Sequence, residues 1–152
     1  MFVIFHFKKT LYYGNTLAKK DYYLEISSKP DSLPEVEDFL ERIGSENNLD
    51  KTILNNLIIS INEATTNGMM HGNKGDINKK VKISISITDT EIISVIKDEG
   101  KGFDPSQVPD PTRPENLFKE SGRGLFIMNT CCKSVKYDFH PEGTELTLVM
   151  KL

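Results

Sequence analysis

The chain has 152 residues, 38% of them hydrophobic and 27% charged, and this composition is typical of one globular domain rather than of a disordered chain. Its formal net charge of −3 argues against nucleic acid as a direct partner, because contacts with phosphates usually need a basic surface. No apolar run is long enough to cross a bilayer, and the two cysteines are neighbours that predict neither a disulfide nor a zinc site, so we expect a cytoplasmic protein without membrane contact.

The chain opens with a segment of no clear pattern, which a strand follows. Residues 1–21 show no clean periodicity, so we expect an N-terminal extension or arm there. Residues 22–28 alternate loosely between apolar and polar side chains and are rich in aromatic residues, which predicts a strand. The remainder, residues 22–152, is then expected to form a single domain.

Two helices are expected next. Residues 29–47 have candidate N-terminal caps at Asp31 and Ser32, and a proline that suits a first helical turn. Their apolar stripe at helical spacing consists of Val36, Phe39, Leu40 and Ile43. Residues 50–71 predict a longer helix, with a glycine directly after it. Its buried stripe consists of Leu54, Leu57, Ile58, Ile61, Ala64 and Thr65.

The second half of the chain predicts two strand pairs separated by a long loop. Residues 81–88 and 91–98 read as strands of an antiparallel hairpin. Residues 99–121 hold four of the seven prolines and no periodicity, which is typical of a long functional loop. A short helix from about Gly124 and two closing strands follow. This order predicts an α+β fold, a two-layer sandwich whose mixed, mostly antiparallel sheet has helices on one face.

The longer helix has a polar face as well as an apolar one. Its polar residues are spaced by three or four positions and therefore share one side of the helix. They are Asn56, Ser60, Glu63, Asn67 and His71. A solvated surface is one interpretation of such a face. A ligand site is the other, because small residues lie beside it and no lysine or arginine occurs from residue 52 to residue 73.

Two later segments combine glycines with polar side chains. Asp98 ends an apolar strand, and Gly100 and Gly102 follow it. A carboxylate there can accept a hydrogen bond from an exocyclic amine, and glycines let the backbone pass close to a ligand. Residues 122–124 precede the short helix, where free N–H groups and an arginine favour an anion. A plain turn and a flexible hinge are the alternatives for these segments.

Three segments in this order closely resemble the three motifs of the Bergerat-fold ATP-binding module, the superfamily of gyrase, histidine kinases and MutL. They are NEATTNGMMHGN (62–73), DEGKGFDP (98–105) and ESGRGLFIMN (120–129). The terminal GTELTLVMKL (143–152) is similar to its closing strand, and the resemblance covers about residues 22–152. A chain of 152 residues has no room for the further domains of the larger members, so we expect the branch of small anti-sigma-factor serine/threonine kinases of bacterial partner-switching systems.

The resemblance implies a role for each motif. Glu63 would be the general base that takes the proton of the acceptor hydroxyl, and Asn67 would be the Mg²⁺ ligand. Asp98 would bind the adenine, and Thr144 would support the adenine side through its hydroxyl. The other nucleotide-binding residues that it implies are Gly100, Gly102, Gly122, Arg123, Gly124 and Leu125. Residues 104–121 would form a lid.

The implied function is that of an ATP- and Mg²⁺-dependent protein serine/threonine kinase. Its acceptor would lie on a small antagonist protein, and as a homodimer the kinase would also sequester a regulator such as a sigma factor. Two alternatives stay open: a non-catalytic module whose bound ATP switches partner affinity, and a detached histidine-kinase catalytic domain. Glu63 favours the kinase. The roles of His71 and of Asn73 at the helix end stay open.

Overall fold

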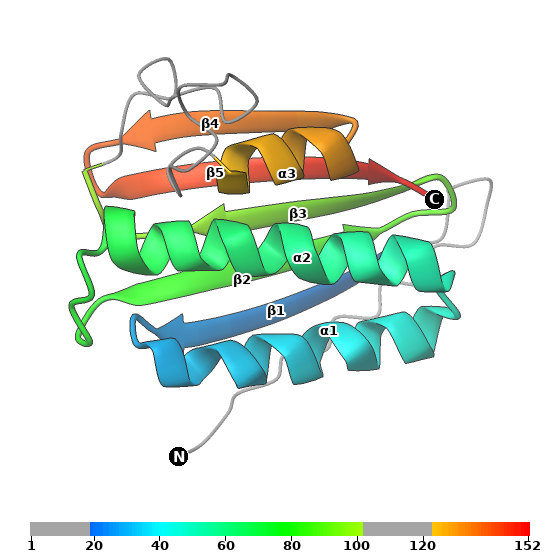
Figure 1. The fold of residues 1–152 in the computed structure, drawn as a ribbon, viewed down its shortest axis with the longest axis horizontal. Coiled ribbons are helices and arrows are strands. Elements are labelled where there is room, and N and C mark those ends of the chain that lie inside the picture. Colours follow the sequence, from blue (N-terminus) through cyan, green and yellow to red (C-terminus); the bar gives the residue numbers. More distant parts are fainter. Residues whose placement is uncertain (1–18, 102–122) are drawn as a thin grey trace.

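Three helices cover one face of a five-stranded sheet in the computed structural model, which describes residues 19–101 and 123–152 (Figure 1). The strands are β1 (Lys20–Ser27), β2 (Lys80–Ile87), β3 (Glu91–Lys97), β4 (Ser134–His140) and β5 (Gly143–Lys151). The helices are α1 (Leu33–Asn47), α2 (Lys51–Asn67) and α3 (Arg123–Cys131), with short turns η1 (Pro30–Ser32) and η2 (Gly68–Gly72) before α1 and after α2. Helix α2 lies between α1 and α3 (Figure 1).

The strand order of the sheet is β1-β2-β3-β5-β4, and every pair of neighbouring strands in the described part of the chain is antiparallel. The predicted α+β sandwich with a mostly antiparallel sheet is therefore confirmed. Strands β2 and β5 alternate between buried and more open positions. In β2 this is the period of two that predicted a strand over residues 81–88. Two hairpins, β2–β3 and β4–β5, join through β3 and β5, so the last strand in sequence lies inside the sheet.

The core lies between the sheet and the helices. The predicted stripe of α1 is confirmed, because all four of its apolar side chains are at most 4% exposed. In the predicted stripe of α2, Leu57, Ile61, Ala64 and Thr65 are buried, whereas Leu54 and Ile58 are only partly buried. Full burial of one such aliphatic side chain contributes roughly 1.5–3 kcal/mol, so this layer holds the helices on the sheet.

The two ends of α2 differ in their hydrogen bonding. At its start, Asp50 Oδ1 accepts a hydrogen bond from Thr52 N at 2.8 Å, as an N-cap does. The side-chain cap predicted for α1 is not formed. At its end, α2 widens into the π-helical turn η2, and Asn73 N donates to Gly68 O at 2.7 Å. The wider turn breaks the 3.6-residue spacing of the helix just before the chain enters β2.

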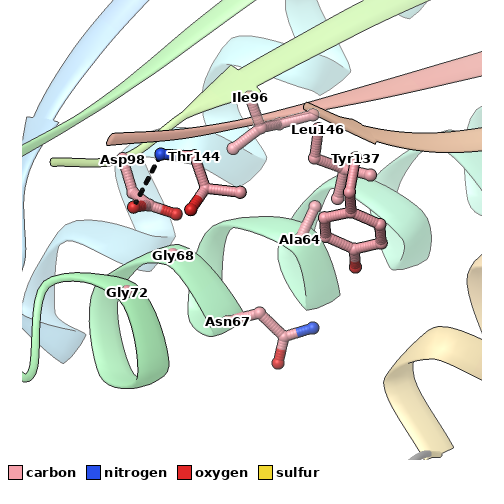
Figure 2. Close-up of a pocket in the computed structure, with 9 residues that line it drawn as sticks. All are labelled: Ala64, Asn67, Gly68, Gly72, Ile96, Asp98, Tyr137, Thr144 and Leu146. Atoms are coloured by element: carbon pink, nitrogen blue, oxygen red, sulfur yellow. Dashed lines mark hydrogen bonds between the residues drawn. The ribbon is translucent and has the colours of Figure 1, made fainter. Parts of the chain in front are cut away.

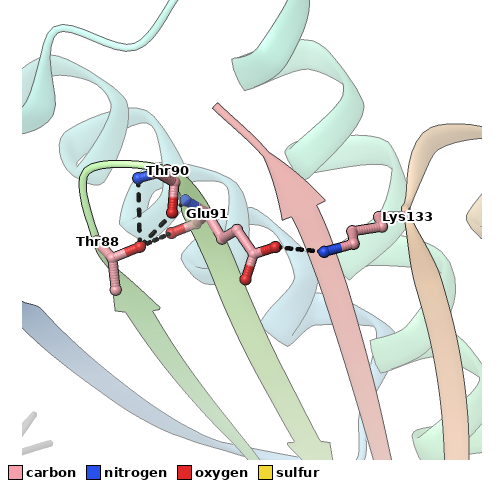
Figure 3. A network of polar contacts seen from close by, with 4 residues as sticks. All are labelled: Thr88, Thr90, Glu91 and Lys133. Carbon is pink, nitrogen blue, oxygen red and sulfur yellow. Dashed lines mark hydrogen bonds and ion pairs between the residues drawn. The ribbon is translucent and has the colours of Figure 1, made fainter.

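The turn between β2 and β3 is closed by polar contacts at one end of the sheet (Figure 3). Thr88 Oγ1 accepts from Glu91 N at 3.1 Å and donates to Glu91 O at 3.2 Å. The carboxylate of Glu91 also pairs with Lys133 at 2.7 Å. This ion pair is partly exposed, so it contributes at most about 1 kcal/mol. Residue 98 follows the other end of β3, away from this network.

Several expectations fall on parts of the chain outside the described residues. The predicted arm is described only from residue 19 onward. The predicted lid, together with Gly102 and Gly122, lies within residues 102–122. Among the described helices, none is long and apolar enough to cross a membrane.

Candidate functional site

A pocket lies between α2 with the turn that follows it and the sheet strands β3, β4 and β5 (Figure 2). Its lining consists of Ala64, Asn67, Gly68, Gly72, Ile96, Asp98, Tyr137, Thr144 and Leu146. Asn67, Asp98 and Thr144 were expected from the sequence to bind a nucleotide, and the fold brings all three to this one pocket. Figure 2 shows Asp98 and Thr144 at one end of the pocket and Tyr137 at the other.

Asp98 is the buried acid of the pocket and is 8% exposed. Its Oδ1 accepts hydrogen bonds from Gly100 N at 2.7 Å and from Thr144 N at 3.4 Å, and its second carboxylate oxygen has no protein donor among residues 19–101 and 123–152. Burial raises the pKa of the Asp98 carboxyl, and the two backbone donors and Lys79 oppose that rise. The second oxygen is therefore an acceptor available to an amino group of a ligand.

Close backbone contacts around Asp98 explain why glycines are needed here. A Cβ added at Gly72 would lie 2.5 Å from Asp98 Cγ, and one at Gly100 would overlap the backbone of Gly72. At Gly68 the added Cβ would lie 3.3 Å from Asp98 Cβ, which is tight but within reach of a small adjustment. The turn after β3 thus packs directly on the turn after α2, and this contact fixes one wall of the pocket.

Strands β4 and β5 supply the other wall. Thr144 is 3% exposed, and its hydroxyl has no hydrogen-bond partner in the described part of the chain, so it can bond a ligand or a water. Tyr137 stands opposite Leu146 in the ladder and stacks on Phe139 with ring centroids 6.2 Å apart. Burial and the nearby charge of Asp98 raise the pKa of Tyr137 to about 12. No sequence signal marks Tyr137, because an aromatic residue is common in a strand and Phe139 stands two positions after it.

The polar face predicted on α2 has two parts, one of which contacts the end of α3 while the other lies beside the pocket. Toward its start, the face packs on the end of α3 and the residue after it: Cys131 Sγ lies 3.8 Å from Asn56 Oδ1, and Cys132 Sγ lies 3.8 Å from Ser60 Oγ. The two cysteines, for which the sequence predicts neither a disulfide nor a zinc site, thus make polar contacts with α2. His71 is exposed in η2 and does not line the pocket, because the π-helical turn breaks the helical spacing before it.

The other part of this face lies beside the pocket and the start of α3. A Cβ added at Gly124 would overlap Glu63 Oε2 and would lie 3.5 Å from Asn67 Nδ2. Glu63 itself is partly buried. Arg123 is exposed at the first turn of α3, and Leu125 packs against the core. The fold therefore brings Glu63, Asn67 and the start of α3 together next to the pocket.

Asn73 forms a polar network behind the pocket that the sequence did not predict. Its side chain is 1% exposed. Nδ2 donates to Ser28 Oγ at 2.8 Å and to Lys80 O at 2.9 Å, and Oδ1 accepts from Glu99 N at 2.7 Å. These bonds connect the chain after α2 with the residue that follows β1, with β2, and with the residue that follows Asp98. An asparagine at the end of a helix is a common helix-ending residue, so the pattern alone gave no sign of this network.

The chain matches a known family of domains and several curated proteins. Residues 26–150 match the model of the histidine kinase-like ATPase domain. The anti-sigma F factor of Bacillus subtilis (strain 168) is 35% identical over 97 residues, covering 60% of this chain and 65% of that protein. The anti-sigma F factor of Clostridium perfringens (strain 13) is 32% identical over 111 residues, covering 68% and 78%.

A serine-protein kinase, RsbW of Bacillus subtilis (strain 168), is 29% identical over 93 residues, covering 57% of this chain and 58% of that protein. The chain thus spans less than two thirds of the length of the two Bacillus subtilis relatives. The crystal structure of the RsbU and RsbW domains of a Mycobacterium tuberculosis protein superposes with a TM-score of 0.66 at 15% identity, covering 87% of this chain and 32% of that one. This last similarity supports the fold.

Proposed function

The chain belongs to the histidine kinase-like ATPase domain family, and from that premise we propose that it is an ATP-dependent protein serine/threonine kinase of the anti-sigma-factor type. The observation that carries the proposal is that Asp98, Thr144 and Asn67 line one and the same pocket, with Glu63 beside it. The names of the relatives, anti-sigma F factor and serine-protein kinase, support the same function.

The pocket suits the adenine ring of ATP. The second carboxylate oxygen of Asp98 accepts a hydrogen bond from the 6-amino group, and the hydroxyl of Thr144 bonds the ring directly or through a water. Ala64, Ile96 and Leu146 provide apolar contacts for the two faces of the base. This combination of an apolar lining and a few polar groups is usual for a small-molecule site.

Asn67 is the residue that would hold Mg²⁺, through its amide oxygen. Its side chain lines the pocket on the side of α3, where the phosphates of a nucleotide seated on Asp98 would extend. Mg²⁺ prefers oxygen ligands and keeps several waters, so one amide oxygen from the protein fits it. When bound, the ion supplies charge neutralisation for the phosphate oxygens.

Glu63 takes the proton of the acceptor hydroxyl in this proposal. Phosphoryl transfer mainly requires positioning and charge neutralisation, and the protein contributes little covalent chemistry. Arg123 and the N–H of Gly124 at the start of α3 bind the phosphates, while the Glu63 carboxylate next to Gly124 receives the proton. Gly102, Gly100, Gly122 and Leu125 complete the proposed nucleotide-binding set.

The proposed acceptor is a serine or threonine of a small antagonist protein. We also propose that the chain binds a regulator such as a sigma factor and acts as a homodimer. The anti-sigma F factors of Bacillus subtilis and Clostridium perfringens support a partner of this kind. A nucleotide-dependent binding module without transfer is the second candidate, and the Glu63 carboxylate beside the pocket favours the kinase over it.

Incubation with radiolabelled Mg-ATP and a candidate antagonist tests the proposal. Wild type should label a serine or threonine, and Glu63→Ala should lower the rate by about 10²–10⁴-fold, because that is the usual contribution of a general base. ATP affinity should stay close to that of wild type. Lys133→Ala, which removes only the ion pair with Glu91, is the matched control and should keep full activity. Acid-labile label would indicate histidine transfer, and ATP binding without label would favour the binding module.

A further inference from the structure

Strands β2 and β3 separate at the end of the sheet that carries the pocket. The last pair of their ladder is Lys82 with Lys97. Continuing this antiparallel register would place Lys80 opposite Glu99, with their backbone groups bonded to each other. Instead, Lys80 N donates to the side chain of Glu99, at Oε2, over 2.6 Å, and Glu99 N donates to Asn73 Oδ1 over 2.7 Å.

The side-chain amide of Asn73 occupies the place of the missing pair. It accepts from Glu99 N through Oδ1 and donates to Lys80 O through Nδ2 at 2.9 Å, so it bridges the two groups that would otherwise bond. Nδ2 also donates to Ser28 Oγ at 2.8 Å, and Asn73 N donates to Gly68 O at 2.7 Å. Because Asn73 is 1% exposed and both ends of its amide are hydrogen-bonded, its side chain is held in one position between the two strands.

The Asn73 amide holds the backbone on one side of Asp98, and β5 holds it on the other side. Asp98 N donates to Thr144 O at 3.0 Å, while the N–H of the next peptide unit, that of Glu99, is held by Asn73. Gly100 N then turns back onto Asp98 Oδ1 at 2.7 Å. With both flanking peptide units held, the direction of the carboxylate is set, including that of its second oxygen.

We infer that Asn73 is a positioning residue for base recognition: its amide, inserted between β2 and the end of β3, directs the Asp98 carboxylate at the 6-amino group of a purine nucleotide. Asn73 does not line the pocket, so it acts through Asp98. The inference rests on the proposed binding of ATP and assigns to Asn73 the selectivity for a 6-amino over a 6-oxo purine. Without the amide, the N–H of Glu99 loses its acceptor, and the backbone that carries the Asp98 carboxylate is then held on one side only, by the bond from Asp98 N to Thr144 O.

Isothermal titration calorimetry with ATP and ITP tests this inference, because the two bases differ in an amino group or an oxygen at position 6. Wild type should prefer ATP, and Asn73→Ala should reduce that preference by about tenfold, the effect of one well-directed hydrogen bond. Ser28→Ala is the matched control. It removes a buried partner of Asn73 but leaves the bond to Glu99, so it should lower the unfolding temperature and keep the preference for ATP.

The outcomes separate the inference from the proposed function. If wild type bound ATP and ITP equally, adenine recognition by Asp98 would be wrong and the inference would fail with it. If wild type preferred ATP and Asn73→Ala kept the full preference, or if Ser28→Ala lost it equally, only the role of Asn73 would be wrong. Should Asn73→Ala not fold, hydrogen exchange of wild type decides: Glu99 N–H should be protected like a strand amide, and exchange at the rate of an open loop would overturn the inference.

Discussion

Replacing Asp98 by asparagine changes the chemistry of the pocket while keeping its shape. In Asp98→Asn the amide oxygen keeps the bonds that Oδ1 accepts from Gly100 N at 2.7 Å and Thr144 N at 3.4 Å. The amide nitrogen must then occupy the position of the second carboxylate oxygen. A donor replaces the acceptor that faces the adenine 6-amino group, so we expect the affinity for ATP to fall.

The size of the loss follows from the hydrogen bond that is removed. A hydrogen bond to a charged acceptor contributes roughly 1.5–3 kcal/mol, which corresponds to about 10- to 150-fold in Kd. Asp98 is 8% exposed, so water compensates little and the upper part of this range applies. ITP should lose much less affinity, because the new amide can donate to the oxygen at position 6.

The same substitution should not reduce stability. Burial raises the pKa of Asp98 in the folded chain above its ordinary value of 3.8, so the folded state binds the proton more readily than the unfolded state does. The stability linked to this group is fully present below pH 3.8 and is lost as the pH rises through the folded-state pKa. Asp98→Asn should therefore keep or raise Tm at neutral pH and remove this pH dependence.

Calorimetric titration with ATP and ITP measures the binding, and circular dichroism measures thermal unfolding from acidic to neutral pH. Lys133→Ala is the control, because its ion pair with Glu91 at 2.7 Å lies at the opposite end of β3 (Figure 3). This variant should bind ATP as wild type does. Unchanged ATP affinity in a folded Asp98→Asn protein would refute the assignment of Asp98 to the adenine.

Three further variants test other parts of the site and fold. Gly124→Ala places a Cβ against the Glu63 carboxylate, so phosphorylation of an antagonist should slow by about 100-fold, while calorimetry should show a largely unchanged ATP affinity. Equal phosphorylation rates of Gly124→Ala and wild type would contradict the position given to Glu63. Gly72→Ala pushes on the Asp98 carboxylate, and calorimetry should show about a tenfold weaker binding of ATP. Asp50→Ala removes the cap of α2 and should lower the urea midpoint. The Thr52 amide lowers the pKa of Asp50, so the stabilisation by this cap is present above pH 3.8 and is lost as the pH falls through the folded-state pKa. If the urea midpoints of wild type and Asp50→Ala still differed in acid, this role of the Asp50 carboxylate would be wrong.

The polar face of α2 illustrates how far a helical pattern reaches. The spacing of Asn56, Ser60, Glu63 and Asn67 places them on one side of α2, because the 3.6-residue period depends only on local backbone geometry. His71 falls outside this face, because the π-helical turn η2 breaks the period before it. The spacing could not predict which residues of other elements contact that side of the helix. In the folded chain, Asn56 and Ser60 contact the two cysteines at the end of α3 and directly after it, while Glu63 and Asn67 lie by Gly124 at the pocket.

The sequence by itself determined the helices, the strands and the pocket residues that its motifs include. The period of two over residues 81–88, the apolar stripe of α1 and an acid directly after an apolar strand are local patterns, and they predicted β2, α1 and Asp98. The resemblance to the Bergerat fold adds Thr144, which lines the pocket. The roles of these residues stay predictions that the experiments above test.

Only the tertiary structure decided how these elements meet. The strand order β1-β2-β3-β5-β4 brings Tyr137 of β4 to a pocket whose acid follows β3. The β2–β3 ladder ends at the pair Lys82 and Lys97, and beyond it the Asn73 side chain bridges Lys80 and Glu99. Both features depend on contacts between residues distant in the chain. A single asparagine or tyrosine has the same local pattern whether or not such a contact exists, so the fold alone revealed them.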